Sequence, residues 1–175
     1  MMCSEGLILY RRRASSEELE ELRWVANLQF DGYGVELIPD DIILVISLST
    51  GKIRYLLHDN KLYLSLRAGD HRFLLHIPSA KVLNKVAKHP RFRVYVNNNY
   101  AEFIKSGGNV FSKHVVMADP EIRPGDEVIV VDENGELIGV GRAIRPGWEM
   151  IYYNWGEAVR IREGVLEEFR SGKRN

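Results

Sequence analysis

The spacing of apolar residues changes from a helical period to a period of two near residue 52, and this change constrains the fold most strongly. Between residues 15 and 30 apolar side chains recur every three or four positions, which indicates an amphipathic helix. From Lys52 onward they alternate with polar residues, which indicates strands. A helix followed by alternating strands favours the α+β class, with an N-terminal helix and an antiparallel meander.

The first helix carries its own start and stop signals. Ser15 is followed three residues later by Glu18, the spacing of a capping box in which each side chain satisfies a free backbone N–H. Gly32 and Gly34 end the pattern. We expect a helix over residues 15–30 whose buried face is formed by Leu19, Leu22, Val25, Ala26 and Gln29.

Three alternating runs follow, separated by turns at Asp59-Asn60 and Gly69-Asp70, and predict a three-stranded meander. Because neighbouring side chains in a strand point to opposite faces, one face of this meander should be apolar. The expected apolar face consists of Ile53, Tyr55, Leu57, Leu62, Leu64, Leu66, Phe73, Leu75 and Ile77. The opposite face is expected to display Arg54, Tyr63, Ser65, Arg67, Arg72 and His76.

A second helix is expected to open at Pro78-Ser79, with Lys81, Lys85 and Lys88 along its outward side. A strand should follow, with Arg93 and Tyr95 facing outward. The turn at residues 97–99 then marks a boundary. We therefore expect a first domain over residues 1–99, whose part from 52 to 99 is basic.

Residues 100–175 are expected to form a small β-barrel with a short C-terminal tail. A hairpin is predicted from residues 127–131 and 137–143, because Asn134-Gly135 between them suits the positive φ angles of a type I′ turn. Gly139 and Gly141 leave one face of the second strand without side chains, which suits a bulge or close approach of another backbone.

Further short elements complete the predicted barrel. Strands are expected at residues 101–104, 150–153 and 157–161, and a helical turn capped by Asn109 at residues 109–114. About six strands in so short a segment favour closure into a barrel.

Charge is segregated along the chain although the formal net charge is zero. Residues 1–51 carry a net charge of −5, residues 52–113 carry +9 and residues 114–175 carry −4. We expect the positive charge to belong to one compact domain that attracts phosphates, acidic lipid headgroups or an acidic protein surface. The alternative is a solvated surface neutralised by the acidic flanks.

Several classes of protein are disfavoured. The longest apolar run, residues 42–46, is far shorter than the roughly 20 residues that span a bilayer, and the N-terminus lacks a signal peptide's leading positive charge. A single cysteine, Cys3, excludes an intramolecular disulfide and a thiolate-rich metal cage. We expect a cytoplasmic protein without a membrane partner.

No catalytic or cofactor motif is present. The five histidines, His58, His71, His76, His89 and His114, show no metal-ligand spacing, and no phosphate-binding glycine loop or nucleophile elbow occurs. The adjacent pair Asp40-Asp41 diverges in any regular structure, so helix capping explains it better than acid–base chemistry. We predict no catalytic residue, no metal and no cofactor.

Ordered motifs in the last third carry a family resemblance. They comprise Gly107–Val115, Ala118-Asp119-Pro120, Ile122–Val128, Leu137–Ala143, Gly147, Glu149-Met150 and Gly156–Val159. These motifs resemble the PUA domain, a small RNA-binding β-barrel. Upstream, the segments Leu22–Phe30, Pro39–Asp41, Ser49–Arg54 and Leu64–Ala68 resemble the C-terminal half of archaeal tRNA-guanine (archaeosine) transglycosylases.

The resemblance implies that both domains hold tRNA. In that family the chemistry belongs to a separate TIM barrel with an aspartate nucleophile and a cysteine-rich zinc site, which this sequence lacks. The resemblance therefore implies a protein that works alone or supplies the RNA-binding half to a separately encoded RNA-modifying enzyme.

The same resemblance implies which residues contact RNA. The glycine break of the PUA domain corresponds to Gly107, Gly108 and Asn109. Cations within reach are Lys105, Lys113, His114, Arg142 and Arg145, of which we favour Lys113 and Arg142. The basic domain adds Arg54, Arg67, Arg72, Lys81 and Lys85. The two glycines could equally serve a tight turn, Trp148 could pack or stack on a base, and Val110 and Phe111 are expected in the core.

Three functions stay open at this point. The first is a non-catalytic factor or subunit for RNA modification that binds tRNA or another structured RNA. The second is a ribosome-associated translation factor. The third is a protein-interaction module whose acidic segments dock a basic enzyme.

Overall fold

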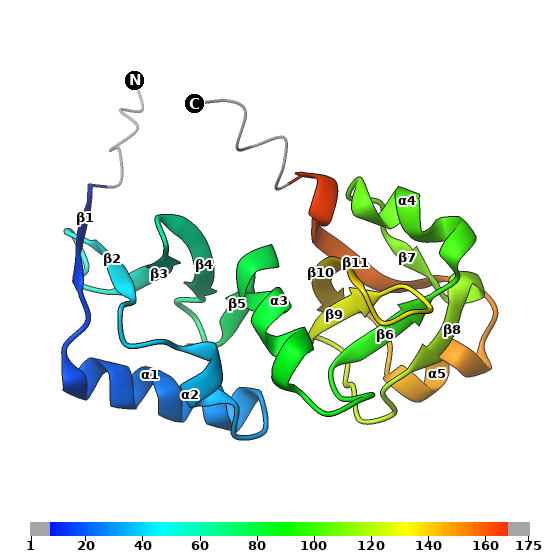
Figure 1. Cartoon of the computed structure of the whole chain (residues 1–175), viewed down its shortest axis with the longest axis horizontal. Coiled ribbons are helices and arrows are strands. Elements are labelled where there is room, and N and C mark those ends of the chain that lie inside the picture. Colours follow the sequence, from blue (N-terminus) through cyan, green and yellow to red (C-terminus); the bar gives the residue numbers. More distant parts are fainter. Residues whose placement is uncertain (1–7, 168–175) are drawn as a thin grey trace. The chain divides into compact units, whose positions relative to one another are not determined.

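Two β-sheets organise the chain, a five-stranded antiparallel sheet early in the sequence and a six-stranded, barrel-like sheet later (Figure 1). The computed structural model describes residues 8–167. It divides into two compact units, Met1–Ser79 and Ala80–Asn175. The α+β class and the barrel are confirmed. Cys3 and the chain after residue 167 lie outside the described residues, and no helix between these limits is long and apolar enough to cross a bilayer.

The first unit combines a sheet with two helices. Its strands follow the order β1-β2-β3-β4-β5 in the sheet. The elements are β1 Leu9–Arg13, α1 Ser16–Gln29, α2 Gly34–Leu37, β2 Ile43–Ser47, β3 Ile53–His58, β4 Lys61–Leu66 and β5 Phe73–Leu75. Helix α3, Ile77–Val86, begins in this unit and continues into the second.

Helix α1 begins and ends as the sequence predicts. The Glu18 backbone N–H donates to Ser15 Oγ at 3.2 Å, and the Ser15 N–H donates to Glu18 Oε2 at 2.9 Å. Arg12 in β1 donates to both oxygens of Glu18, at 2.7 and 2.6 Å, and lowers the pKa of that carboxyl to about 2. At the other end, the Gln29 side-chain amide both donates to and accepts from the Phe73 backbone at 2.8 Å, which fixes α1 to β5.

Two strands of this sheet escape prediction. Strand β1 is exposed along its whole length, so it shows no alternation, and β2 is almost entirely buried, so it shows a continuous apolar run. The predicted meander corresponds to β3, β4 and β5 of a larger sheet.

The predicted polar face of the meander is partly wrong. Tyr63 is only 1% exposed and donates from its hydroxyl to the Leu37 carbonyl at 2.6 Å. Ser65 and His76 are also buried, with Oγ and Nε2 2.6 Å apart. A register shift between Leu56 and Leu57 opposite β4 breaks the strict alternation that the prediction assumed. Two residues expected inside, Tyr55 and Leu62, are exposed.

The second unit is a nearly closed sheet with strand order β7-β11-β10-β9-β6-β8. Its strands are β6 Arg93–Val96, β7 Val110–Phe111, β8 Val115–Ala118, β9 Glu127–Val131, β10 Leu137–Ala143 and β11 Glu157–Gly164. Its helices are η1 Asn98–Tyr100, α4 Ala101–Lys105, η2 Ser112–His114 and α5 Gly147–Tyr152.

Strand β6 belongs to this barrel, whereas the sequence analysis placed residues 93–96 in the first domain. It pairs antiparallel with β8 and parallel with β9. The observed division after Ser79 therefore differs from the predicted boundary at residue 99. Parallel pairing leaves no local turn signal, so no residue pattern indicates that β6 joins later strands.

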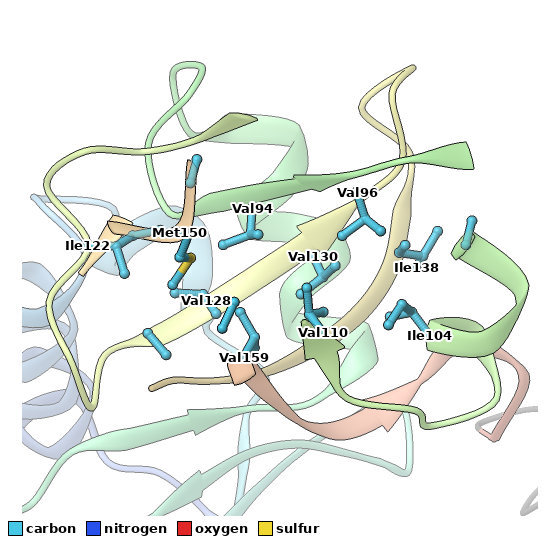
Figure 2. Close-up of a cluster of buried hydrophobic side chains, with 14 residues drawn as sticks. Val94, Val96, Ile104, Val110, Ile122, Val128, Val130, Ile138, Met150 and Val159 are labelled. Carbon is cyan, nitrogen blue, oxygen red and sulfur yellow. The ribbon is translucent and has the colours of Figure 1, made fainter. Parts of the chain in front are cut away.

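The barrel encloses one apolar core (Figure 2). Its strands contribute Val94, Val96, Val110, Val128, Val130, Ile138 and Val159. Ile104 of α4 and Met150 of α5 fill opposite ends of the same core (Figures 1 and 2). Residues 101–104 and 150–153 were predicted as strands, because runs this short do not distinguish a strand from one turn of a buried helix.

The predicted hairpin of β9 and β10 is confirmed, but its turn differs. The Gly135 N–H donates to the Asp132 carbonyl at 3.0 Å, the Asp132 N–H donates to the Glu136 carbonyl at 2.9 Å, and only Gly135 in this turn has positive φ. This is a longer turn closed by one left-handed glycine in place of type I′. The close approach expected at Gly141 is confirmed, since an added Cβ would collide with the Arg160 carbonyl of β11.

Arg93 was expected on the surface and is fully buried. Its guanidinium donates to the Asn84 and Ala87 carbonyls at 2.6 and 2.9 Å, and its Nε donates to Asn84 Oδ1 at 2.7 Å. These carbonyls end helix α3 and have no partner within it, so the buried charge satisfies them. Strand alternation alone cannot reveal such a partner.

We predict that Gly141→Ala lowers the free energy of unfolding by about 1–3 kcal/mol, because β10 or β11 must shift to admit the methyl group. Gly69→Ala is the matched control, since open space surrounds that position, and it should change stability by less than about 0.5 kcal/mol. Chemical denaturation followed by circular dichroism measures both. Equal stabilities for the two variants would contradict the close packing of β10 on β11.

Candidate nucleic-acid interface

The glycine break between α4 and β7 is a structural turn. Gly107 has a φ of +96° and its N–H donates to the Ile104 carbonyl, while the Gly108 N–H donates to the Phe103 carbonyl, both at 2.9 Å. Both backbone donors are therefore used inside the turn. Side chains also occupy the space above the glycines, since an added Cβ would meet Glu167 at Gly107 and the Phe103 ring at Gly108.

Asn109 does not cap a helix as predicted. Its Oδ1 accepts from the Ile161 backbone N–H of β11 at 2.9 Å, which ties the start of β7 to the barrel wall. The predicted helical turn at 109–114 is instead strand β7 followed by the short helix η2. Direct contact of Gly107, Gly108 and Asn109 with RNA stays a prediction.

The five predicted cations of the barrel differ in how freely they could pair with a phosphate. Lys113 and Arg142 are exposed and make no ion pair within residues 8–167. Lys105 donates to Glu102 at 2.9 Å, and this hydrogen bond raises its pKa. Arg145 lies over the Trp155 ring, with 4.5 Å from guanidinium carbon to ring centroid.

The His114 side chain stacks on a neighbouring aromatic ring and contributes little positive charge. The centroid of its imidazole lies 3.6 Å from the centroid of the Tyr100 ring, and the two ring planes differ by 13°. Burial, helped by the charge of Lys113, lowers the pKa of His114 below its ordinary value. At neutral pH the imidazole is therefore uncharged.

The strand register adds a cation that sequence reasoning missed. Arg142 in β10 and Arg160 in β11 are directly opposite each other and both are exposed, so they share the outer face of the barrel wall. Arg160 donates to Glu157 at 3.0 and 3.2 Å. Phe111 in β7, which was expected in the core, is 38% exposed, whereas its neighbour Val110 is buried as predicted.

Four exposed aromatic side chains gather within eight residues, and we call them the aromatic cluster: Trp148, Tyr152, Tyr153 and Trp155. Trp148, Tyr152 and Trp155 are 51%, 75% and 67% exposed. Ring centroids of Tyr153 lie 5.0 Å from Tyr152 and 6.5 Å from Trp155.

The aromatic cluster adjoins the segment that carries Lys113, because the Ser112 N–H donates to the Gly156 carbonyl at 2.9 Å. Of these four residues only Trp148 is predicted as a possible contact, because residues 150–153 are expected to form a strand. The signal that could have revealed the whole cluster is the density of aromatic residues between 148 and 155, which no closed barrel of this size can bury.

The remaining predicted cations are divided between the two units. Arg54, Arg67 and Arg72 lie in the first unit, whereas Lys81 and Lys85 lie in the second and are exposed on α3. Arg67 donates to both oxygens of Asp70, at 2.9 and 2.5 Å, and lowers the pKa of that carboxyl. Arg54 is partly buried. The positive stretch 52–113 thus spans the division between the two units. Its assignment to one domain and joint binding by both units stay predictions.

One group of metal-ligand side chains occurs within the part of the chain that the structure describes. Asp41, His58 and Asp59 have ligand atoms within 4.8 Å of one another. Asp41 approaches His58 Nδ1 at 3.2 Å, and Asp59 approaches Nε2 at 3.5 Å. The two carboxylates approach different nitrogens of one ring, and both are exposed, as acidic groups without a metal commonly are, so we assign no metal to them.

Comparison with known families identifies both parts of the chain. Residues 20–90 match the patch-forming domain C2 of tRNA-guanine transglycosylase, and residues 92–165 match the PUA domain, an RNA-binding fold. The chain thus contains these two domains in the order that the sequence motifs indicated.

The curated relatives are archaeal enzymes that are much longer. The tRNA-guanine(15) transglycosylase of Thermoplasma volcanium is 42% identical over 152 residues, which are 85% of this chain and 24% of that protein. The Pyrococcus abyssi enzyme is 40% identical over 140 residues, 80% of this chain and 22% of that protein. The chain spans about a quarter of the length of these relatives and matches their C-terminal portion.

Solved structures share the fold over nearly the whole chain. The hypothetical protein PH0734.1 from Pyrococcus horikoshii OT3 superposes with a TM-score of 0.72, covering 93% of this chain and 99% of that one, at 19% identity. At this identity the likeness establishes the fold alone.

We predict that the His114 imidazole titrates below the ordinary value of about 6.5. Its folded-state pKa is lowered, so its contribution to stability is present above the unfolded pKa and is lost as pH falls through the folded pKa. Ring-proton NMR titration measures the midpoint, with His114→Gln assigning the signal and the denatured protein giving the reference. A midpoint at or above the denatured value would contradict the stacked, partly buried geometry.

Proposed function

We propose that this chain is a non-catalytic protein that binds structured RNA, with tRNA as its main ligand. It would act as an accessory factor or subunit in cytoplasmic RNA modification. The observation that carries the proposal is the outer side of the PUA barrel. There, the exposed Lys113 lies on η2, whose Ser112 is hydrogen-bonded to Gly156 directly after the aromatic cluster. The exposed Arg142 lies on β10, which pairs with β11, the strand that follows the cluster.

The cations supply attraction without sequence information. Lys113 and Arg142 have no carboxylate partner to displace within residues 8–167, so a phosphate gains their full charge. Lys105 and Arg160 must first break their ion pairs with Glu102 and Glu157, so each contributes less to the attraction of phosphate. Such contacts position a folded RNA through its backbone.

The aromatic cluster supplies a second kind of contact. Exposed aromatic rings stack on unpaired bases, which folded RNAs present in loops and at their ends. Arg145 over Trp155 holds that ring in place and adds positive charge beside it. A surface with both kinds of contact favours RNA that combines a helix with unpaired nucleotides, as tRNA does.

The relatives support the assignment to RNA modification. They are tRNA-guanine(15) transglycosylases, and the part of them that this chain resembles is about a quarter of their length. We propose that a separately encoded RNA-modifying enzyme supplies the chemistry, while this chain holds the RNA.

Lys113→Ala and Arg142→Ala should each weaken tRNA binding and reduce the slope of log K against log salt by about 0.7–0.9, the value of one phosphate contact. Different structured RNAs should lose affinity alike. Lys105→Ala is the matched control and should lose less, because Lys105 is already paired with Glu102. Filter binding across a salt series measures these slopes. Millimolar or salt-independent affinity of the unaltered protein for tRNA would refute the proposal, and cosedimentation with small ribosomal subunits alone would favour a translation factor.

Trp155→Ala should weaken binding to RNA with unpaired nucleotides about tenfold, since one stacked base contributes roughly 1–3 kcal/mol. A blunt RNA duplex should bind both proteins equally. Trp24→Ala is the matched control, because Trp24 is 69% exposed against 67% for Trp155 but lies beside carboxylates in the first unit. Equal losses for the two tryptophan variants would show that the aromatic cluster has no special role.

A further inference from the structure

Helix α1 presents a second exposed surface of opposite character. Its inner side buries Leu19, Leu22 and Ala26. On the opposite side Glu17, Glu21, Trp24 and Leu28 follow one another at helical spacing, and we call them the α1 stripe. Trp24 is 69% and Leu28 is 83% exposed, so half of the stripe is apolar surface in water.

The other half of the α1 stripe is acidic and unpaired. Glu17 and Glu21, with Glu20 beside them, are exposed and form no ion pair with any residue from 8 to 167. Glu18 differs, since Arg12 and the Ser15 backbone N–H occupy its oxygens. Capping therefore explains Glu18, and the helix dipole favours Glu17 in the first turn. Neither explains Glu20 and Glu21.

A pocket adjoins the α1 stripe. It has a volume of about 280 Å³, and Glu21 is part of both its lining and the stripe. Its apolar lining comes from α1, β3 and β4, namely Leu22, Val25, Ile53 and Leu66. The volume suffices for one large apolar side chain.

We propose that the α1 stripe and this pocket form a docking surface for a protein partner that presents an apolar side chain with basic residues beside it. The apolar side chain would enter the pocket, Trp24 and Leu28 would be covered, and the basic residues would pair with Glu17 and Glu21. The identity of the partner as the RNA-modifying enzyme rests on the proposed function.

The chemistry of the α1 stripe argues against the other occupants. The pocket lining also contains Lys52, Arg67 and His71, which come from segments outside α1. RNA on the stripe itself is disfavoured, because a phosphate backbone would lie against three unpaired carboxylates. A second copy of the chain fits poorly, since a two-fold axis across the helix would set the acidic half of one copy on the apolar half of the other. Carboxylates buried in that way would lose water without gaining a partner.

The test uses a defined probe. In the curated relatives the matched region is part of a chain about four times longer, so the probe is the Thermoplasma volcanium enzyme truncated to remove its matched C-terminal portion. Titration calorimetry with the full-length chain should give a one-to-one complex of micromolar or better affinity. The double variant Trp24→Ala/Leu28→Ala should lose at least about tenfold in affinity, and Glu17→Lys/Glu21→Lys should lose affinity and reduce its salt dependence.

Controls separate this proposal from the proposed function. Trp155→Ala should leave docking unchanged. Trp24→Ala/Leu28→Ala should leave tRNA affinity and the melting temperature unchanged, because both side chains are exposed. Glu17→Lys/Glu21→Lys should not weaken tRNA binding, because it replaces negative charge with positive charge. No complex with the probe, or a complex insensitive to both α1 variants, overturns the docking proposal while tRNA binding stands. A dimer of the chain alone that the Trp24→Ala/Leu28→Ala variant abolishes overturns it in favour of a second copy, and loss of tRNA binding in the α1 variants overturns it in favour of RNA.

Discussion

The barrel wall depends on the contact between the backbones of β10 and β11 at Gly141. Any side chain there would occupy the position of the Arg160 carbonyl. The same pairing places Arg142 opposite Arg160 and aligns Val159 with Ala143 inside. One missing side chain therefore determines both the closure of the core and the arrangement of cations outside it.

Local signals predicted the elements that are stabilised locally. The hydrogen bonds of the Ser15–Glu18 capping box and of the β9–β10 hairpin are made between residues close in sequence. Their residue pattern is therefore enough to predict them. Elements whose partners are distant were missed. Strand β1 is held by β2, whose residues are 30 to 38 positions away. The helices at 101–105 and 147–152 fill the barrel ends only because six strands have formed around them.

The candidate interface was predicted in part for the same reason. The exposure of Lys113 and Arg142 followed from the family motifs, whereas the partners of Lys105 and Arg67 are the nearby Glu102 and Asp70, whose pairing depends on side-chain geometry. The net charge of residues 52–113 already includes Glu102 and Asp70, but it does not show that Arg93 is buried or that Arg91 pairs with Asp119 outside this stretch. The charge count therefore overstated the exposed positive charge. Arg160 belongs to the candidate interface because of the strand register, and Trp155 because of the loop shape. No residue pattern reveals either.

The hydrogen bond from Ser112 to Gly156 joins the loop of Trp155 to the short helix that carries Lys113. Arg145 over Trp155 fixes the ring from the other side. A ligand that meets both groups finds them already held in place, so little conformational freedom is lost on association. In the proposed RNA complex, rigidity of this kind would favour a fixed spacing between a base and a phosphate over a fixed base identity.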